Sequence, residues 1–338
     1  MSHWWRRVRK RLNFLLVKAE MKLGRERLWS YPYLLCVDVT NKCNLHCPFC
    51  PTGRGEQGGR GRGHMDLATF RHIIDELGPY AYSVELFNWG EPFFAKDLPA
   101  MIAYAEERGV PTIISSNLSF PLDEARVEAV VEAGLSYLTA SIDGADQASY
   151  EKYRRGGRFD LALSNVRKFV AAKQRRGSSK PYITWQYLVF AHNESLVDQA
   201  RALANEIGVD HFSAVGGLYE DPAWAPKGQY SFDYLDIRPN RCVWLWEKAV
   251  FHWDGGFASC CSGFHKKDDF DTYRPGTFRQ MWNNEKFIAA RRIWTRPHTP
   301  LPAGHYCTDC DKVRLFRGLP LRSGPAKAAS IEAKAASA

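Results

Sequence analysis

The sequence predicts an α/β fold, an open or partial barrel of parallel strands followed by a small cysteine-rich unit. Two observations predict it. Short apolar segments alternate with amphipathic helical segments from Leu34 to about Gly217, and five of the nine cysteines lie after Arg241. Strands that alternate with helices are typical of βα units and a parallel sheet.

Each element follows from its own pattern. Short apolar runs predict strands at 34–39, 83–87, 111–115, 136–141, 183–190 and 211–215. Helical periodicity predicts helices at 66–77, 97–108, 122–133, 160–175 and 195–207. Because ligands in such folds bind at the carboxyl ends of the strands, residues directly after a strand are the candidates for a site.

Composition shifts predict five segments: a basic arm at 1–33, the barrel at 34–217, a linker at 218–241, a cysteine-rich unit at 242–317 and a disordered tail at 318–338. Within the cysteine-rich unit, Asp254-Gly255-Gly256 predicts a hairpin turn, and a helix is expected near 277–294.

The formal charge of +9 belongs mainly to the arm, because residues 1–33 hold nine Lys/Arg and two Glu. A nucleic-acid binder spreads basic residues over its binding domain, so nucleic acid is not expected as a partner. No stretch is long and apolar enough for a membrane span, and no secretory signal is evident. We therefore expect a cytoplasmic protein whose cysteines bind metal or react rather than form disulfides.

The arm is amphipathic if it is helical. Trp4, Trp5, Val8, Leu12, Leu15 and Leu16 then share one face, with Arg and Lys crowded on the other. This pattern favours peripheral contact of residues 1–20 with an anionic membrane at its inner face. The alternative is that the apolar face docks on the barrel.

Three cysteines follow the first predicted strand. Cys43, Cys47 and Cys50 are spaced C-x3-C-x2-C, with no fourth cysteine nearby. Zinc sites commonly pair their cysteines as two C-x2-C motifs, whereas three thiolates on an iron–sulfur cluster leave one iron open. The spacing favours the cluster, with zinc as the alternative.

This stretch resembles the signature of the radical S-adenosylmethionine (SAM) enzymes, C-x3-C-x-aromatic-C, in which Phe49 supplies the aromatic position. The resemblance implies that SAM completes the coordination of the open iron. It also implies that the reduced cluster cleaves SAM to a 5′-deoxyadenosyl radical that removes a hydrogen atom from the substrate.

Further matches follow successive strands and imply contacts to SAM. "NWGEP" resembles the family's Gly-Gly-Glu-Pro motif, although Asn88 and Trp89 replace its usual small residues. "YRRGGRFD" resembles a segment whose arginine meets the SAM carboxylate, and Arg154 is preferred to Arg155 for this role. The expected SAM-binding residues are Phe49, Gly90, Glu91, Pro92, Ser116, Asn117, Ser141, Asp143 and Arg154.

The second cysteine set resembles a SPASM domain in its short, one-cluster "twitch" form. Cys242, Cys260, Cys307 and Cys310 would ligate an auxiliary 4Fe–4S cluster, with structural zinc as the alternative. Cys261 adjoins this set without being needed as a ligand. It is a candidate catalytic hydrogen-atom donor, as in some related epimerases, or a packed thiol.

The glycine- and arginine-rich segment 53–64 follows the trio and offers Arg54, Arg60 and Arg62. Arginine there can hold a phosphate or carboxylate, or the segment is a mobile solvated loop.

Together these features predict a radical SAM enzyme with two 4Fe–4S clusters and SAM, reduced by a flavodoxin or ferredoxin. The twitch resemblance favours dehydrogenation or epimerisation of a sugar, cyclitol or other polyol, phosphorylated or lipid-linked in view of the basic segments. One alternative is a maturase of ribosomally made peptides, although only 42 residues precede Cys43. Another is a non-catalytic metal-binding protein.

Overall fold

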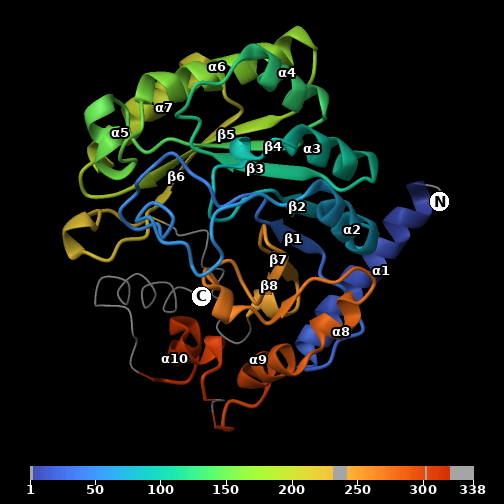
Figure 1. The fold of residues 1–338 in the computed structure, drawn as a ribbon. Helices are drawn as coiled ribbons and strands as arrows, with labels where there is room; N and C mark the ends of the chain where they lie inside the picture. The colour runs from blue at the N-terminus through green and yellow to red at the C-terminus, as the bar shows by residue number, and fades with distance from the viewer. Residues whose placement is uncertain (1–2, 231–241, 301–302, 320–338) are drawn as a thin grey trace.

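A computed structural model describes residues 3–230, 242–300 and 303–319. Its centre is one sheet with the strand order β6-β5-β4-β3-β2-β1-β7-β8-β9, open at both edges (Figure 1). Strands β1 to β6 run parallel, β7 is parallel to β1, and β8 and β9 are antiparallel to their neighbours. The strands are β1 Leu34–Val37, β2 Ser83–Glu85, β3 Thr112–Ser116, β4 Tyr137–Ser141, β5 Tyr182–Val189, β6 His211–Gly216, β7 Lys248–Phe251, β8 Gly256–Ala258 and β9 Asp271–Thr272.

The helices that follow β1 to β5 cover one face of this sheet. Apolar side chains such as Phe70 and Ile74 of α2 join one core with Leu35, Val84 and Ile114 of the strands. We call the covered face the outer face and the opposite one the inner face. The helices are α1 His3–Lys22, α2 Leu67–Leu77, α3 Leu98–Glu107, α4 Glu124–Glu132, α5 Gln147–Tyr153, α6 Phe159–Arg175, α7 Val197–Ile207, α8 Phe278–Trp282, α9 Glu285–Thr295 and α10 Asp311–Phe316.

The cysteine-rich unit continues the barrel sheet. Residues of β7 pair with β1 in parallel, in the register Cys36↔Val250, and the β7–β8 hairpin turns at the predicted glycines. Behind the hairpin, Phe257 packs against Phe278 and Phe287 with ring centroids 5.5 and 4.9 Å apart. The hairpin therefore holds its position through both main-chain pairing and an aromatic core.

The predicted strands and helices are present, with ends that differ by up to two residues. Two helices, α5 and α10, were not predicted. The helix expected near 277–294 is two helices, because Asn283 bonds the main chain of Leu28 and Asn284 caps α9 by accepting from Phe287 N. Part of the predicted linker is ordered, since Pro222–Trp224 forms a 3-10 helix. Residues 231–241 and 320–338, including most of the predicted tail, lie outside the described residues.

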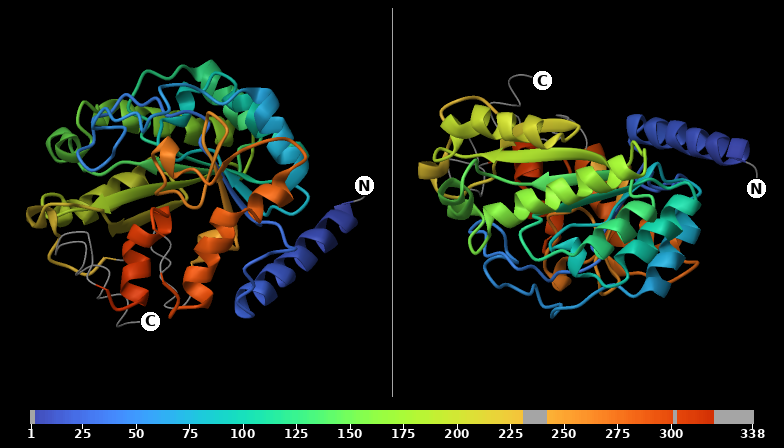
Figure 2. Two further views of the ribbon diagram at one scale, coloured as in Figure 1. Left: turned by 60° about the horizontal axis from the view of Figure 1, so that its bottom comes forward. Right: turned by 90° about the horizontal axis from the view of Figure 1, so that it is seen from above.

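Helix α1 lies across the amino end of the sheet (Figures 1 and 2). Its Phe14 packs on Tyr33 and Tyr82, which immediately precede β1 and β2. Lys10 Nζ donates to the carbonyl of Gly109, just before β3. The arm docks on the barrel, as the alternative interpretation expected, but not through the face that carries Trp4 and Leu12. The docked face mixes polar residues with the apolar Phe14, Val17 and Met21. None of the described helices is both long and apolar enough to span a bilayer.

Candidate functional site

The first cysteine loop lies at the carboxyl end of the sheet, as predicted. Cys47 is buried, while Cys43 and Cys50 are half-buried, and the three share a cluster with Tyr153 and Phe190. Burial raises the pKa of Cys43 to about 12, and the neighbouring Glu91, Cys47 and Cys50 raise it further. Burial likewise raises the pKa of Cys47 to about 11, although Arg154 opposes this increase. Thiols this close together exchange their protons for metal when a cluster binds.

Close main-chain approach fixes the shape of this loop. A Cβ at Gly53 would lie 2.5 Å from both the amide nitrogen and the carbonyl oxygen of Cys47, so a side chain there would displace the loop. His46 N donates to the carbonyl of Arg155 at 2.9 Å, which ties the loop to the segment after α5. The side chain of His46 is exposed and lies outside the buried thiol cluster.

The predicted residues after β2 and β3 form one buried hydrogen-bonded group beside the cysteines. Glu91 accepts from Ser116 Oγ at 2.7 Å and from the Asn117 amide at 2.9 Å. Asn117 Nδ2 lies 3.9 Å from Cys43 Sγ. Burial raises the pKa of Glu91 to about 7, and the hydrogen bonds it accepts oppose that increase. Gly90 lets this turn press against Thr40, because a Cβ there would meet the Thr40 carbonyl oxygen at 2.0 Å.

The residues after β4 supply a buried ion pair. Arg154 Nε donates to Asp143 Oδ2 at 2.5 Å, and Asp143 Oδ1 accepts from the Leu188 amide at 2.7 Å. Arg154 is close enough to Cys47 to lower the pKa of that thiol, whereas Arg155 is exposed. Asp143 therefore positions Arg154. Ser141, at the end of β4, bonds Ser115 at 3.0 Å.

An aromatic residue from a distant segment covers the first loop. Phe49 meets Trp224 edge-on, with ring centroids 5.0 Å apart, and also lies beside Phe190. Trp224 comes from the segment predicted to be a linker, so this residue was missed. No periodic pattern in the sequence indicates Trp224. The only signal was the Pro-Ala-Trp sequence that contains it.

The four cysteines of the second set also come together. Burial raises the pKa of Cys307, and the thiols of Cys260, Cys310 and Cys242 raise it further. Burial raises the pKa of Cys242 to about 12. In the described ranges, no three His, Cys, Asp or Glu side chains converge on a point where one ion would sit. Thiolates of an iron–sulfur cluster bind separate irons and need no such convergence.

Cys261 lies on the inner face of the sheet, beside an ion pair that sequence reasoning missed. Lys248 Nζ of β7 is 2.6 Å from Glu85 Oε2 of β2. Burial raises the pKa of Cys261 to about 12; Cys260 adds to the increase and Lys248 opposes it. Cys36 of β1 is buried next to this group.

The ion pair belongs to a polar row on the inner face. In parallel strands, paired residues point to the same side of the sheet, so the register defines this row. In the sequence, this row appears as a polar residue at every second position of an otherwise apolar strand. The row consists of Cys36, Glu85, Ser115, Thr139, Ser141, Thr184, Gln186, Ser213 and Lys248.

Two of the three arginines in segment 53–64 are already paired with carboxylates. Arg60 is buried and pairs with Asp254 at 2.9 Å and with Asp269, and it also donates to the carbonyl of Phe264. Arg54 pairs with Glu56 and Glu220. Arg60 therefore joins this segment to the β7–β8 hairpin. This corrects the expectation that Arg60 is free to hold a phosphate or carboxylate.

Comparisons with known proteins agree with this geometry. A model of the Radical SAM superfamily matches residues 37–184, and one of the SPASM iron–sulfur cluster-binding domain matches residues 242–311, together more than half of the chain. The chain belongs to the radical SAM superfamily. Its cofactors are accordingly SAM and 4Fe–4S clusters. The donor set fits them, because three thiols adjoin a buried carboxyl and an arginine, and four further thiols are gathered in the SPASM domain.

Several relatives of this radical SAM protein have names that bear on substrates. PqqA peptide cyclase of Gluconobacter oxydans is 29% identical over 286 residues, covering 75% of this chain and 77% of that protein. Fe-coproporphyrin III synthase of Methanosarcina barkeri is 34% identical over 130 residues, covering 38% of this chain and 32% of that protein. The structure of Streptococcus suis SuiB bound to its precursor peptide SuiA superposes with a TM-score of 0.61 at 14% identity, covering 82% of this chain and 70% of that one. The last likeness concerns the fold.

Proposed function

We propose that this radical SAM enzyme modifies a peptide by removing hydrogen from an unactivated carbon. The observation that carries the proposal is the similarity to PqqA peptide cyclase, which extends along three quarters of the chain. This similarity favours the peptide-maturase alternative of the sequence analysis over a polyol substrate. SuiB, whose fold is similar, was solved with a precursor peptide bound.

In this proposal Cys43, Cys47 and Cys50 hold the cluster that takes part in SAM cleavage. When bound, this cluster and SAM supply the radical that abstracts the substrate hydrogen atom. The chain's own part is to place the substrate carbon and to exclude water and competing reactions. Phe49 and Trp224 serve the second purpose by covering the loop with aromatic rings.

Opposite charges orient SAM in this proposal. Glu91 faces the SAM amino group and Arg154, held by Asp143, faces its carboxylate. A carboxylate in a buried setting pairs more strongly with a cation than it would in water. The remaining contacts are assigned to Gly90, Pro92, Ser116, Asn117 and Ser141.

The auxiliary cluster is assigned to Cys242, Cys260, Cys307 and Cys310. Four protein thiolates would fill the coordination positions of such a cluster, which would suit electron transfer rather than substrate binding. An oxidative peptide modification removes two hydrogen atoms, so one further electron and one proton leave the substrate after the first abstraction. An auxiliary 4Fe–4S cluster bound by these four cysteines would supply an acceptor for that electron. A flavodoxin or ferredoxin is the proposed external reductant.

The polar row on the inner face favours a second candidate, oxidation or epimerisation of a polyol. Glu85 and Lys248 with the hydroxyl side chains of the row can hydrogen-bond a substrate rich in hydroxyl groups. In the epimerisation variant, Cys261 returns a hydrogen atom from its thiol to the substrate carbon. The thiol then becomes a thiyl radical, which the external reductant and a proton restore.

One experiment separates the two candidates. Anaerobically reconstituted full-length protein is incubated with SAM and reduced flavodoxin, with a library of short synthetic peptides or a panel of sugars and cyclitols. We expect a peptide to raise 5′-deoxyadenosine formation above the substrate-free rate and to lose the mass of two hydrogen atoms. Stimulation by polyols alone would contradict the peptide proposal and support the second candidate.

A further inference from the structure

Helix α1 is fixed to the barrel by one face. Asn13 exchanges two hydrogen bonds with the main chain of Tyr31, at 2.8 and 2.9 Å, and Lys18 Nζ bonds Glu247 at 2.5 Å. Glu20 accepts from the Trp29 and Ser30 amides. Contacts from the middle of the helix to its C-terminal end fix it to the body of the protein.

The opposite face of α1 is apolar and has no partner in the described structure. Residues three and four apart share one side of a helix, and the exposed apolar side chains follow this spacing over the whole length of α1. Their exposed fractions include 61% for Trp4, 62% for Leu12, 54% for Leu15 and 72% for Leu23, which follows the helix directly. The members of this outward face are Trp4, Trp5, Val8, Leu12, Leu15, Leu16, Ala19 and Leu23.

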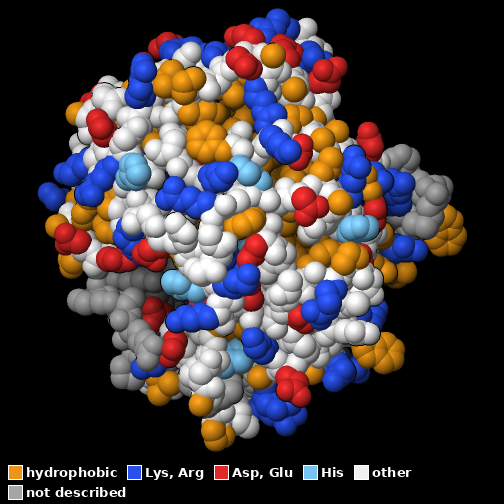
Figure 3. Space-filling view, in the orientation of Figure 1, with side chains coloured by type: hydrophobic (Ala, Val, Ile, Leu, Met, Phe, Trp, Pro, Cys, Tyr) orange, Lys and Arg blue, Asp and Glu red, His pale blue; other side chains and the backbone are white. Residues whose placement is uncertain are grey.

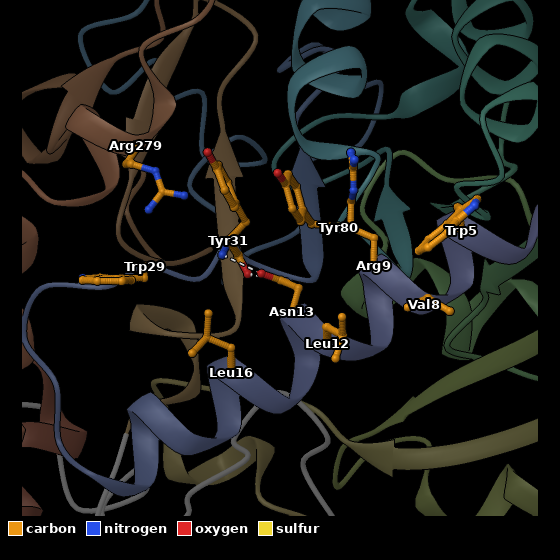
Figure 4. Close-up of a pocket in the computed structure, with 10 residues that line it drawn as sticks. All are labelled: Trp5, Val8, Arg9, Leu12, Asn13, Leu16, Trp29, Tyr31, Tyr80 and Arg279. Atoms are coloured by element: carbon orange, nitrogen blue, oxygen red, sulfur yellow. Dashed lines mark hydrogen bonds between the residues drawn. The ribbon is translucent and has the colours of Figure 1, made fainter. Parts of the chain in front are cut away.

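Beside this face runs a groove of about 680 Å³ between α1 and the body (Figure 4). Leu12 and Leu16 line one wall, and Tyr31 and Tyr80, which stack 4.1 Å apart, line the other. A peptide lying in the groove would leave Trp4, Leu15 and Leu23 uncovered, because these residues do not line the groove. A partner that covers them as well as the groove must be broad and flat.

Basic residues border the outward face. Arg7, Arg11 and Lys22 are exposed and form no ion pair within the described part of the chain. Hydrophobic and basic side chains lie next to one another near the N-terminal end of the molecule in Figure 3. Tryptophan and leucine between cations match the interface of an anionic bilayer, where rings sit at headgroup depth and cations meet lipid phosphates.

We propose that the outward face of α1 docks the enzyme on an anionic membrane surface, with the helix axis in the plane of the membrane. The helix crosses the amino end of the sheet, whereas the cysteine loops lie at the carboxyl end (Figure 2). Docking therefore leaves the catalytic edge turned away from the lipid, open to a substrate and a reductant from solution. This inference does not depend on the proposed function.

The test is co-sedimentation of full-length, reconstituted protein with two kinds of vesicle: phosphatidylcholine alone, or equal parts of phosphatidylcholine and phosphatidylglycerol. We expect binding to the anionic vesicles to be about a hundredfold tighter, since each of three cations near the surface contributes about fivefold. Added salt should weaken it.

Two leucines provide a matched pair of variants, since Leu16 on α1 and Leu218 after β6 are both 40% exposed. Leu16→Glu should weaken vesicle binding by about tenfold or more, because it replaces inserted apolar surface with a repelled charge. Leu218→Glu should leave vesicle binding unchanged. Iron content and melting temperature confirm that both variants are folded. Deletion of residues 1–20 is a poorer test, because Asn13, Val17 and Glu20 are buried.

Several results would overturn the proposal. They are the absence of co-sedimentation at low salt, equal binding to both kinds of vesicle, and equal binding by Leu16→Glu and the native protein. A concentration-dependent dimer that Leu16→Glu dissociates, without vesicle binding, would assign the face to a second copy of the chain. Binding of an acidic amphipathic peptide in place of vesicles would assign it to a peptide partner.

Discussion

Replacement of Arg60 by alanine perturbs the joint between the segment after the first cysteine loop and the SPASM hairpin. The Arg60 side chain is 3% exposed and its guanidinium bonds Asp254, Asp269 and the carbonyls of Phe264 and His265. The two carboxylates are themselves only 11% and 10% exposed. The alanine variant leaves both of them buried without their main cation.

The cost follows from that burial. Removing one partner of a buried ion pair costs about 3–5 kcal/mol, because the charge left behind stays desolvated and unpaired. Lys266, 3.4 Å from Asp254, offsets part of this. We therefore expect Arg60→Ala to lower the free energy of unfolding by about 3 kcal/mol. Since the segment also leads back to Cys50, iron retention should decrease as well.

Urea unfolding of anaerobic protein, followed by fluorescence and by iron release, measures both effects. Arg62→Ala is the matched control, because Arg62 is in the same segment, is exposed and has no ion pair within the described ranges. Its effect should stay within about 0.5 kcal/mol. Asp269→Asn combined with Arg60→Ala should cost less than the sum of the single changes. Equal stability of the Arg60 and Arg62 variants would refute the reasoning.

The other predictions concern the catalytic edge. Calorimetry should show that Glu91→Gln binds SAM more weakly than the native protein does. In the native protein, the affinity for SAM should fall as pH drops below about 7, because the protonated carboxyl of Glu91 no longer attracts the SAM amino group. A native affinity that is constant from pH 8 to about pH 6 would contradict this role. If the reaction is an oxidation, Cys261→Ala should stay active. If the enzyme is an epimerase, Cys261→Ala should still form 5′-deoxyadenosine but should lose the inverted product. The native epimerase should then incorporate solvent deuterium into that product. Gly53→Ala should destabilise the protein by about 1–3 kcal/mol and lower iron content, because its Cβ would press on Cys47; normal iron loading would show that the loop tolerates the side chain.

The sequence predicted the elements whose signals are local. Apolar runs and helical periodicity identify the barrel, and C-x3-C-x2-C after a strand identifies the first loop, because parallel strands end at a common edge. The buried Glu91 and the half-buried Arg154 followed from motifs at such strand ends, and the structure brings both beside the cysteines.

Features that depend on long-range pairing were not predicted. Arg60 lies in a glycine-rich segment that looks solvated, and its partners are about 200 residues away in the chain. Lys248 meets Glu85 only because β7 pairs with β1, which no local pattern specifies. The docked face of α1 was missed because Asn13 and Glu20 are anchored by main-chain groups of the following segment, whereas periodicity emphasised the apolar residues.

The central claim is that Cys43, Cys47 and Cys50 hold the cluster needed for SAM cleavage. The most direct test compares native protein with a variant in which all three cysteines are alanine. Both are reconstituted anaerobically and assayed for iron, sulfide and reductive SAM cleavage. The native protein should hold about eight irons and form 5′-deoxyadenosine. The variant should keep about half of the iron, in the auxiliary cluster, and form none. Continued SAM cleavage by the variant, or iron content equal to that of the native protein, would contradict the account.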